Sequence, residues 1–326
     1  MIASKAVWTR RDPREGPAVA LSSHITRRVA LYFAGALLVL IAAPAGAGAQ
    51  TDHWQVGTAP SLSSGKYGTD ARTDVLYTPI TARRLFENGD IALIFPMTCI
   101  KGNGGVTVVN GSPVRTDQTR GGSPTGGTSG RPGAGDSSRH GTDSGRGTDT
   151  GVGTTAIAPT ASLTTCGMGD ISVRGRYYVL DERGWLPTIA VRGHVKAPTA
   201  NGERGLGTGR PDEGIGLEVS RSIGGGLMAM VDGGYTIIGQ PDGIEFNNTW
   251  WYDIGLGQSI AGGLVDLSAF FEEYQSIVPG LSGSREVLAA LSLKVPGGWR
   301  LQVTGEVGLS DGAPDHGVTF GASRRF

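Results

Sequence analysis

Apolar and polar residues alternate with a period of two along much of the C-terminal two thirds of this chain. The clearest segments are residues 171–178, 189–196, 215–220, 286–294 and 300–309. Successive side chains of a β-strand point to opposite faces, so each segment has one apolar and one polar face. A soluble β-sandwich gives the same pattern, and alternation alone therefore does not decide the fold class.

The connections between these segments are sorted by length. Short turns are expected at residues 87–90, 181–184, 224–226, 261–263 and 296–298, and longer links at 61–70, 100–168, 197–213, 240–249, 278–284 and 310–317. Short and long connections alternate, which gives twelve strands if residues 54–60 form the first. Outer-membrane barrels have an even strand number, short periplasmic turns and long outer loops. We therefore predict an all-β fold, a closed antiparallel transmembrane β-barrel of about twelve strands within residues 50–326.

Aromatic residues gather near the expected strand ends. They are Trp185, Trp299 and Phe326 at the short-turn ends, and Tyr235, Trp250, Trp251, Tyr252 and Tyr274 toward the long links. This placement predicts two girdles at the membrane interfaces. The last strand stops on Phe326, which we expect at the periplasmic rim. Lipid of the outer membrane would surround the wall, and the barrel-assembly machinery would recognise the C-terminal strand through Phe326.

The N-terminal residues resemble an export signal. Arg27 and Arg28 precede the apolar run 29–43, and the small residues 47–49 follow. This order predicts a cleaved signal peptide over residues 1–49 and a barrel in the bacterial outer membrane. The alternative is a membrane anchor, but the run is shorter than the ~20 residues of a spanning helix.

Composition agrees with a barrel and argues against nucleic acid. The chain has 326 residues with 55 Gly, and its charged residues make up 18% of the total, below the ~25% of ordinary soluble domains. The 29 basic and 29 acidic residues balance, so no electrostatic case for a nucleic-acid partner exists.

Residues 101–165 form a low-complexity insert rich in Gly, Thr, Ser, Pro and Asp. We expect a disordered outer loop, because the insert lacks the apolar content to fold alone. Its Gly-Asp repeats do not keep the spacing of calcium-binding repeats. Cys99 and Cys166 stand at its two ends, and an oxidising compartment favours a disulfide between them. Two free thiols are the alternative.

Residues for catalysis or metal binding are scattered. The five His show no i,i+4 pair, and two Cys do not make a zinc site. Gly308–Gly312 fits G-x-S-x-G but lies between two expected strands rather than at a strand-to-helix elbow. We expect no catalytic residues, no metal and no cofactor, and hence not an enzyme. A lipid-modifying enzyme that uses Ser310 is the weakest alternative.

The inner face of the expected barrel carries charges of both signs. They are Arg174, Arg176, Arg192, His194, Lys196, Glu218, Asp232, Asp253, Asp266, Glu272, Glu286, Lys294, Arg300 and Glu306. These side chains either pair with one another and fill the lumen or line a path for a polar solute. Both readings stay open.

Several short blocks follow one another along the chain: Gly167-Met168-Gly169-Asp170, Tyr177-Tyr178, Lys196-Ala197-Pro198-Thr199, Leu206-Gly207-Thr208-Gly209 with Asp212, and Gly233-Gly234-Tyr235. In this order they resemble the family named MetA-pathway of phenol degradation, whose members are outer-membrane transporters. The resemblance covers residues 70–326 around the insert, which is itself not typical of the family, and Ala200 stands where the family usually has Gly. It implies a barrel that passes small organic or aromatic compounds, and it carries over no catalytic residue.

These observations predict a channel or transporter for small solutes, aromatic or hydrophobic ones among them. The alternative is a surface-display or adhesion barrel that acts through its Gly/Thr/Asp-rich loop.

Overall fold

The computed structural model describes residues 53–102, 104–109, 111–115, 163–241 and 245–326. The predicted signal peptide lies outside these residues. The strands are β1 (Trp54–Thr58), β2 (Ser61–Gly65), β3 (Thr73–Phe86), β4 (Gly89–Gly102), β5 (Val106–Val109), β6 (Ser112–Arg115), β7 (Leu163–Met168), β8 (Ser172–Leu180), β9 (Thr188–Lys196), β10 (Asp212–Gly224), β11 (Leu227–Ile237), β12 (Thr249–Ile260), β13 (Val265–Tyr274), β14 (Ser284–Val295), β15 (Trp299–Gly308) and β16 (His316–Arg325). Two short 3₁₀ helices are η2 (Gly202–Arg204) and η3 (Ala261–Gly263), and no helix in the described ranges is long and apolar enough to cross a membrane.

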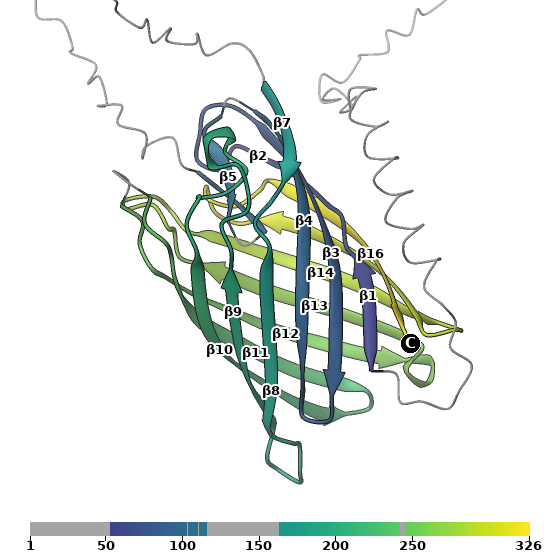
Figure 1. The fold of residues 1–326 in the computed structure, drawn as a ribbon. Helices are drawn as coiled ribbons and strands as arrows, with labels where there is room; N and C mark the ends of the chain where they lie inside the picture. The colour runs from purple at the N-terminus through teal and green to yellow at the C-terminus, as the bar shows by residue number, and fades with distance from the viewer. Residues whose placement is uncertain (1–52, 103, 110, 116–162, 242–244) are drawn as a thin grey trace, which may run out of the picture. The chain divides into compact units, whose positions relative to one another are not determined.

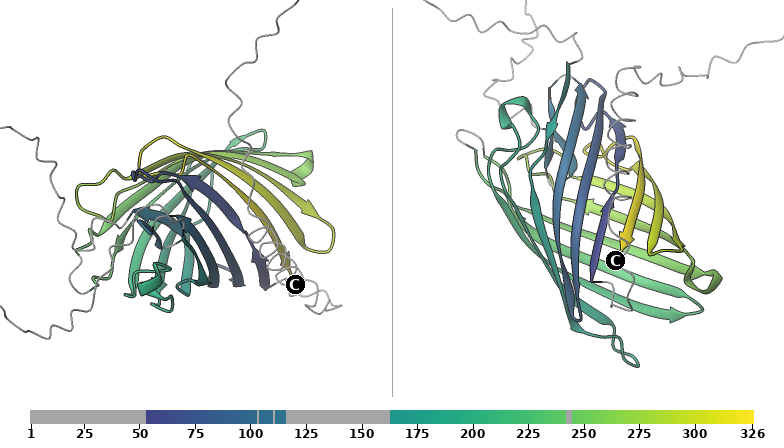
Figure 2. Two further views of the ribbon diagram at one scale, coloured as in Figure 1. Left: turned by 90° about the horizontal axis from the view of Figure 1, so that it is seen from above. Right: turned by 45° about the vertical axis from the view of Figure 1, so that its right-hand side comes forward.

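The sheet closes on itself. Strand β16 pairs with β15 on one side and with β1 and β2 on the other, all antiparallel, so the first strand lies beside the last (Figures 1 and 2). At the seam Trp54 and Phe326 exchange two backbone hydrogen bonds of 3.0 Å. Because β1 with β2, and β7 with β8, are each two parts of one wall strand, the fourteen strands of the sheet make twelve in the wall. The predicted barrel is confirmed.

Short and long connections alternate along the chain as predicted, with two corrections. The first long link is shorter than expected: residues 61–65 form β2, which pairs with both β16 and β3 and so continues the first wall strand. The first strand was predicted to end at Pro60. Its break there has a local cause, since proline has no N–H to donate to a neighbouring strand.

The second correction concerns the insert. Residues 106–109 and 112–115 form the hairpin β5–β6, where a loop without structure was predicted. Val106, Val108 and Val109 are buried. The hairpin lacks apolar surface for a core of its own, and it is buried because other long connections pack against it. Residues 116–162 of the predicted disordered loop lie outside the described residues.

Prolines interrupt the ladder on both sides of the β3–β4 hairpin. Pro79 and Pro96 face each other across this hairpin, beside the breaks between β1 and β2 and between β7 and β8. The carbonyl groups there remain bonded: Pro60 O accepts from Phe320 N at 3.0 Å, and Pro96 O from Gly169 N at 2.9 Å. The strand breaks at this level therefore leave neither of these acceptors unpaired.

The two faces of the wall differ as the alternation predicted. Large apolar side chains stand exposed on the outer face, among them Val173, Val191, Ile215, Val231, Ile254, Leu267, Val287 and Val303. Residues that pair directly across strands point to the same side. The register therefore places the charged residues listed above together on the opposite, inner face.

The predicted disulfide is confirmed. Cys99 of β4 and Cys166 of β7 are direct cross-strand partners, and their sulfur atoms are bonded. The bond closes a segment with a sequence separation of 67 residues, which includes the β5–β6 hairpin. It therefore fixes both ends of the insert at the loop end of the barrel.

Replacing Cys99 and Cys166 together by Ala should lower the free energy of unfolding by roughly 4 kcal/mol, because a long loop then gains entropy in the unfolded chain. Equilibrium urea unfolding of the folded barrel in detergent measures the difference. Before that, a maleimide should label the native protein only after reduction, and labelling of two thiols without reductant would contradict the assignment.

Candidate functional site: a charged chamber at the loop end

A cavity of about 460 Å³ lies inside the barrel toward the long connections. Strands β8 to β14 line its sides, the long connections line its outer end, and the β5–β6 hairpin covers part of it through Val109, Pro113 and Val114. Six of the predicted lumen residues line it: Arg174, Arg192, His194, Asp253, Glu272 and Glu286. We call this cavity the chamber.

The remaining predicted lumen residues lie in ion pairs or elsewhere along the inner face. Arg176 pairs with Glu218 at 3.3 Å, and Arg192 of the chamber pairs with Asp232. At the short-turn end Asp266 lies 3.8 Å from Lys294 and 3.5 Å from Arg300. Glu306 stands over Gly317, where a Cβ atom would collide with its carboxyl group. Part of the inner face is thus an ion-pair network. In the described part of the chain, the chamber carboxylates Asp253, Glu272 and Glu286 do not belong to such a pair.

The prediction that all aromatic residues near the long links face the membrane was wrong for two residues. Trp251 and Tyr274 line the chamber, although their positions near the long links predicted a membrane girdle. Their rings stack with centroids 6.2 Å apart and planes 21° from parallel. Because Trp251 is two residues from the inward-facing Asp253, strand parity was the signal that predicted its direction.

Glycines make room for the indole of Trp251. A Cβ atom at Gly234 would come within 2.8 Å of the Trp251 ring, and one at Gly216 within 3.2 Å. Both distances are too short for an ordinary carbon contact. The neighbouring strands β10 and β11 therefore hold the ring flat against the inner wall.

Tyr67, from the connection between β2 and β3, is a further chamber residue that the sequence did not indicate. It is 1% exposed, and its hydroxyl donates to Ser63 Oγ at 3.0 Å. Burial raises the pKa of the Tyr67 phenol above its ordinary value, so this side of the chamber carries a neutral ring.

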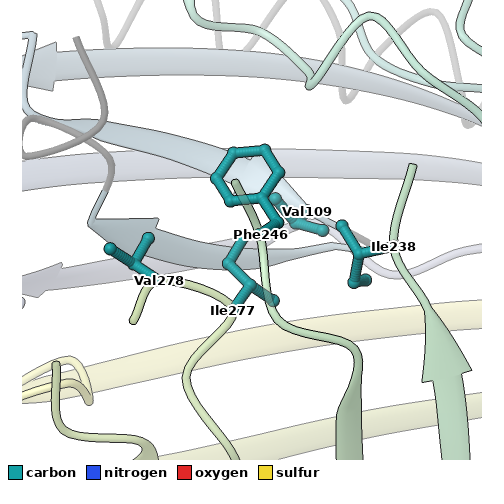
Figure 3. Close-up of a cluster of buried hydrophobic side chains, with 5 residues drawn as sticks. All are labelled: Val109, Ile238, Phe246, Ile277 and Val278. Carbon is teal, nitrogen blue, oxygen red and sulfur yellow. The ribbon is translucent and has the colours of Figure 1, made fainter. Parts of the chain in front are cut away.

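Apolar side chains from other long connections pack against the β5–β6 hairpin. Val109 of β5 packs with Ile238, Phe246, Ile277 and Val278, which come from two other long connections. Figure 3 shows these side chains gathered around one point. On its other side the hairpin contributes Val108 to a second cluster with Val75, Ile100 and Leu206. We call the hairpin with these side chains the cap.

Lys196 holds the connection 197–211 at the loop end. Its ammonium group is 1% exposed and lies 3.2 Å from Asp170 Oδ2, 2.7 Å from Asp212 Oδ2 and 2.8 Å from Thr208 Oγ1. Asp170 Oδ1 also accepts from Ala200 N at 2.9 Å, and Asp212 Oδ1 from Gly239 N at 3.0 Å. One buried cation therefore joins two strands and two connections.

The family-motif residues surround this ion pair. Thr199 Oγ1 accepts from Ile171 N at 2.9 Å and donates to Gly169 O at 3.2 Å. A Cβ atom at Gly207 would lie 2.5 Å from Asp170 Oδ2, and one at Gly167 would lie 2.6 Å from Leu206 Cδ1. Gly209 has φ +70°, which favours glycine. Pro198 lies two residues after the end of β9. The motif thus folds a connection and supports the cap.

Ser310, the Ser of the G-x-S-x-G match, makes backbone contacts inside a loop. Its hydroxyl donates to Gly283 O at 2.8 Å and accepts from Arg285 N at 2.9 Å. Residues His316 and Val307 are strand partners, so His316 lies on the outer face. These contacts tie neighbouring connections together.

A solved outer-membrane channel has the same architecture. The COG4313 outer membrane channel from Pseudomonas putida F1 superposes with a TM-score of 0.57 at 12% identity, over 87% of this chain and 99% of that one. The KdgM porin in complex with disordered oligogalacturonate gives a TM-score of 0.42 at 8% identity, over 83% and 99%. A monoaromatic hydrocarbon channel, CymD, gives 0.37 at 8% identity, over 88% and 92%.

Comparison of sequences gives one match. The model of the MetA-pathway of phenol degradation family matches residues 114–326. No curated protein matches the chain.

Replacing Lys196 by Met should destabilise the barrel by about 3–5 kcal/mol, because two buried carboxylates then lose their cation. The temperature at which the protein loses its compact electrophoretic mobility in detergent measures the change. The matched control is Lys294→Met, whose ammonium group is 46% exposed at the short-turn end. Equal melting of the two variants would show that the buried cation does not hold the loop end together.

Proposed function

Because the chain belongs to the MetA-pathway of phenol degradation family, we propose that it is a bacterial outer-membrane channel for small solutes. In this proposal residues 1–49 are a signal peptide that is removed after export. The barrel of residues 50–326 then spans the outer membrane, with lipid around its apolar face and its long connections outside the cell.

The observation that carries the proposal is a closed wall with a polar chamber inside it. The hydrogen-bonded seam between β16 and the first strand leaves the wall without an edge, which a membrane requires. The chamber of about 460 Å³ has the size of sites for small molecules, roughly 300–1,000 Å³. The name of the Pseudomonas putida relative, an outer membrane channel, agrees with this function.

We place the solute path along the inner face, from the chamber past Glu306 toward Asp266, Lys294 and Arg300. The ion pairs along this face narrow the path and keep it hydrated. The cap stands over the chamber at the loop end, where Val109 and Val114 contribute to both. The hairpin therefore restricts entry from outside, and small solutes pass better than large ones.

The surface-display alternative depends on the loop of residues 101–165, of which residues 116–162 lie outside the described residues. Nothing in the described part of the chain favours a binding surface over a path through the wall. A channel explains the polar chamber, and a display barrel does not require one.

Removing the hairpin should increase conductance. In planar bilayers the wild-type protein should form ion-conducting channels, and a variant with residues 106–115 replaced by a short Gly-Ser link should show a larger single-channel current. A deletion of residues 120–150 is the control, because it leaves the hairpin in place and should not change the current. Wild-type protein that inserts but passes neither ions nor solutes in a liposome-swelling assay would contradict the channel.

We also propose that the barrel-assembly machinery recognises the last strand through Phe326. The short-turn end is its expected position, since Trp54 bonds to its backbone there and Arg325 N donates to Gly298 O at 2.9 Å. An aromatic residue at this rim is typical of outer-membrane barrels.

Deleting Phe326 should lower the amount of folded barrel in the outer membrane, while the protein that does fold keeps the wild-type channel current. Heat-modifiable mobility in membrane fractions gives the folded amount. Phe320→Leu, a change on the outer face of the same strand, should leave it near wild type. A normal folded yield after the deletion would remove Phe326 from the assembly signal.

A further inference from the structure

The chamber has two charged walls of opposite sign. Strands β8 and β9 supply Arg174, Arg192 and His194, while β12 to β14 supply Asp253, Glu272 and Glu286. Between them β10 and β11 contribute small side chains, Gly216 and Thr236. Among these wall strands the charges are therefore separated by side of the barrel, and they do not alternate around it. The hairpin and a long connection add Arg115 and Asp311, one charge of each sign, above the wall strands.

The acidic wall is not arranged as a structural network. Asp253 is the direct cross-strand partner of Glu272, and Glu272 is the partner of Glu286. Like charges directly opposite each other destabilise a sheet. At the short-turn end the carboxylate of Asp266 has two cations within 4 Å. In the described part of the chain Asp253, Glu272 and Glu286 form no ion pair of this kind, so their charge is directed into the chamber.

Arg192 of the basic wall has N–H donors beyond those that its carboxylate partner Asp232 uses. Arg192 pairs with Asp232, and its guanidinium carbon lies 5.6 Å from the ring centroid of Trp251. A guanidinium has five N–H donors, and one carboxylate uses at most two of them in a parallel pair. Arg192 therefore holds a fixed position at the edge of the chamber while it can still donate to a second carboxylate.

Trp251 and Tyr274 provide a stacking surface between the walls. Trp251 contacts Arg192 on the basic side and Tyr274, which belongs to the same strand as Glu272, on the acidic side. Aromatic pairs in offset-stacked or edge-to-face arrangements contribute about 0.5–1.5 kcal/mol beyond the burial of their surface. A ring that rests on this pair has a carboxylate wall on one side and a guanidinium wall on the other.

We propose that the chamber selects small amphoteric aromatic molecules, which carry an ammonium group and a carboxylate on one aromatic frame. This inference rests on the proposed channel function and names its substrate class. A molecule with both charges is attracted by both walls at once, whereas a molecule with one charge is attracted by one wall and repelled by the other. An uncharged aromatic compound gains only the stacking contact.

Four probes with one carbon frame test the substrate class. They are L-phenylalanine, 3-phenylpropanoate, 2-phenylethylamine and 2-phenylethanol, compared by their flux into liposomes that contain the purified barrel. The flux into protein-free liposomes is subtracted for each probe. The remaining flux of phenylalanine should be roughly fivefold higher than that of either singly charged probe, because one partly exposed ion pair has an effect of this size. A faster flux of the amine, of the acid or of the alcohol overturns the proposal, as do equal fluxes.

Two adjacent substitutions separate the wall charge from barrel stability. Glu272→Gln removes a chamber carboxylate and should reduce the preference for phenylalanine over 3-phenylpropanoate. Glu273→Gln is the matched control: Glu273 accepts a hydrogen bond from Tyr252 at 2.8 Å on the outer face, and its loss should leave the preference unchanged. Equal effects of the two variants overturn the assignment.

The same liposomes separate this inference from the channel proposal. If the wild-type barrel conducts K⁺ and Cl⁻ but does not distinguish the four probes, only the substrate class is wrong. If it inserts and conducts nothing, the channel proposal fails, and the substrate class fails with it.

Discussion

The whole structure depends on pairing every backbone N–H and C=O of the wall. Hydrocarbon offers no partner for these groups, so a spanning sheet has to close. Closure is made where Trp54 and Phe326 bond to each other and where β16 meets both parts of the first strand. Once the ring of strands is closed, the alternation of residues along each strand determines which side chains face lipid and which face inward. Apolar side chains face lipid, and charged side chains share an enclosed inner space with Trp251 and Tyr274. Prolines remove N–H donors near the breaks between β1 and β2 and between β7 and β8, and there the carbonyl groups of Pro60 and Pro96 still accept hydrogen bonds.

Regions of the inner face differ in whether their charged side chains form ion pairs. At the loop end Lys196 neutralises Asp170 and Asp212 and so fixes the connection that supports the cap. At the short-turn end Asp266 lies between Lys294 and Arg300. The chamber also lies toward the loop end. There the carboxylates of Asp253, Glu272 and Glu286 stand next to one another and opposite the guanidinium groups of Arg174 and Arg192. In our proposal a solute completes the electrostatic balance of the chamber, while the ion pairs stabilise the two ends of the barrel.

The wall could be predicted from the sequence because period-two alternation and loop length are local signals. The inward direction of the charged residues followed from the same parity. Trp251 and Tyr274 show where position near a strand end was a misleading signal, because it predicted a membrane girdle. Each lies two residues from an inward-facing carboxylate, Asp253 or Glu272, and this spacing indicates an inward direction. The hairpin β5–β6 could not be predicted, because its valines are buried by Ile238, Phe246 and Ile277, which lie far downstream. The partners of Lys196 likewise depend on the path of a connection whose fold no local pattern determines.

Cysteine accessibility along β13 tests the central claim most directly, namely that one face of this wall lines a water-filled path. Single cysteines at Ser268, Phe270 and Glu272 face inward, and those at Leu267, Ala269 and Phe271 face outward. A charged methanethiosulfonate reagent, added while the bilayer current is recorded, should reduce the current at the three inner positions and leave it unchanged at the three outer ones. The native Cys99–Cys166 bond keeps the background unreactive. Equal reaction at both sets, or none at the inner set, would contradict a polar path inside the barrel.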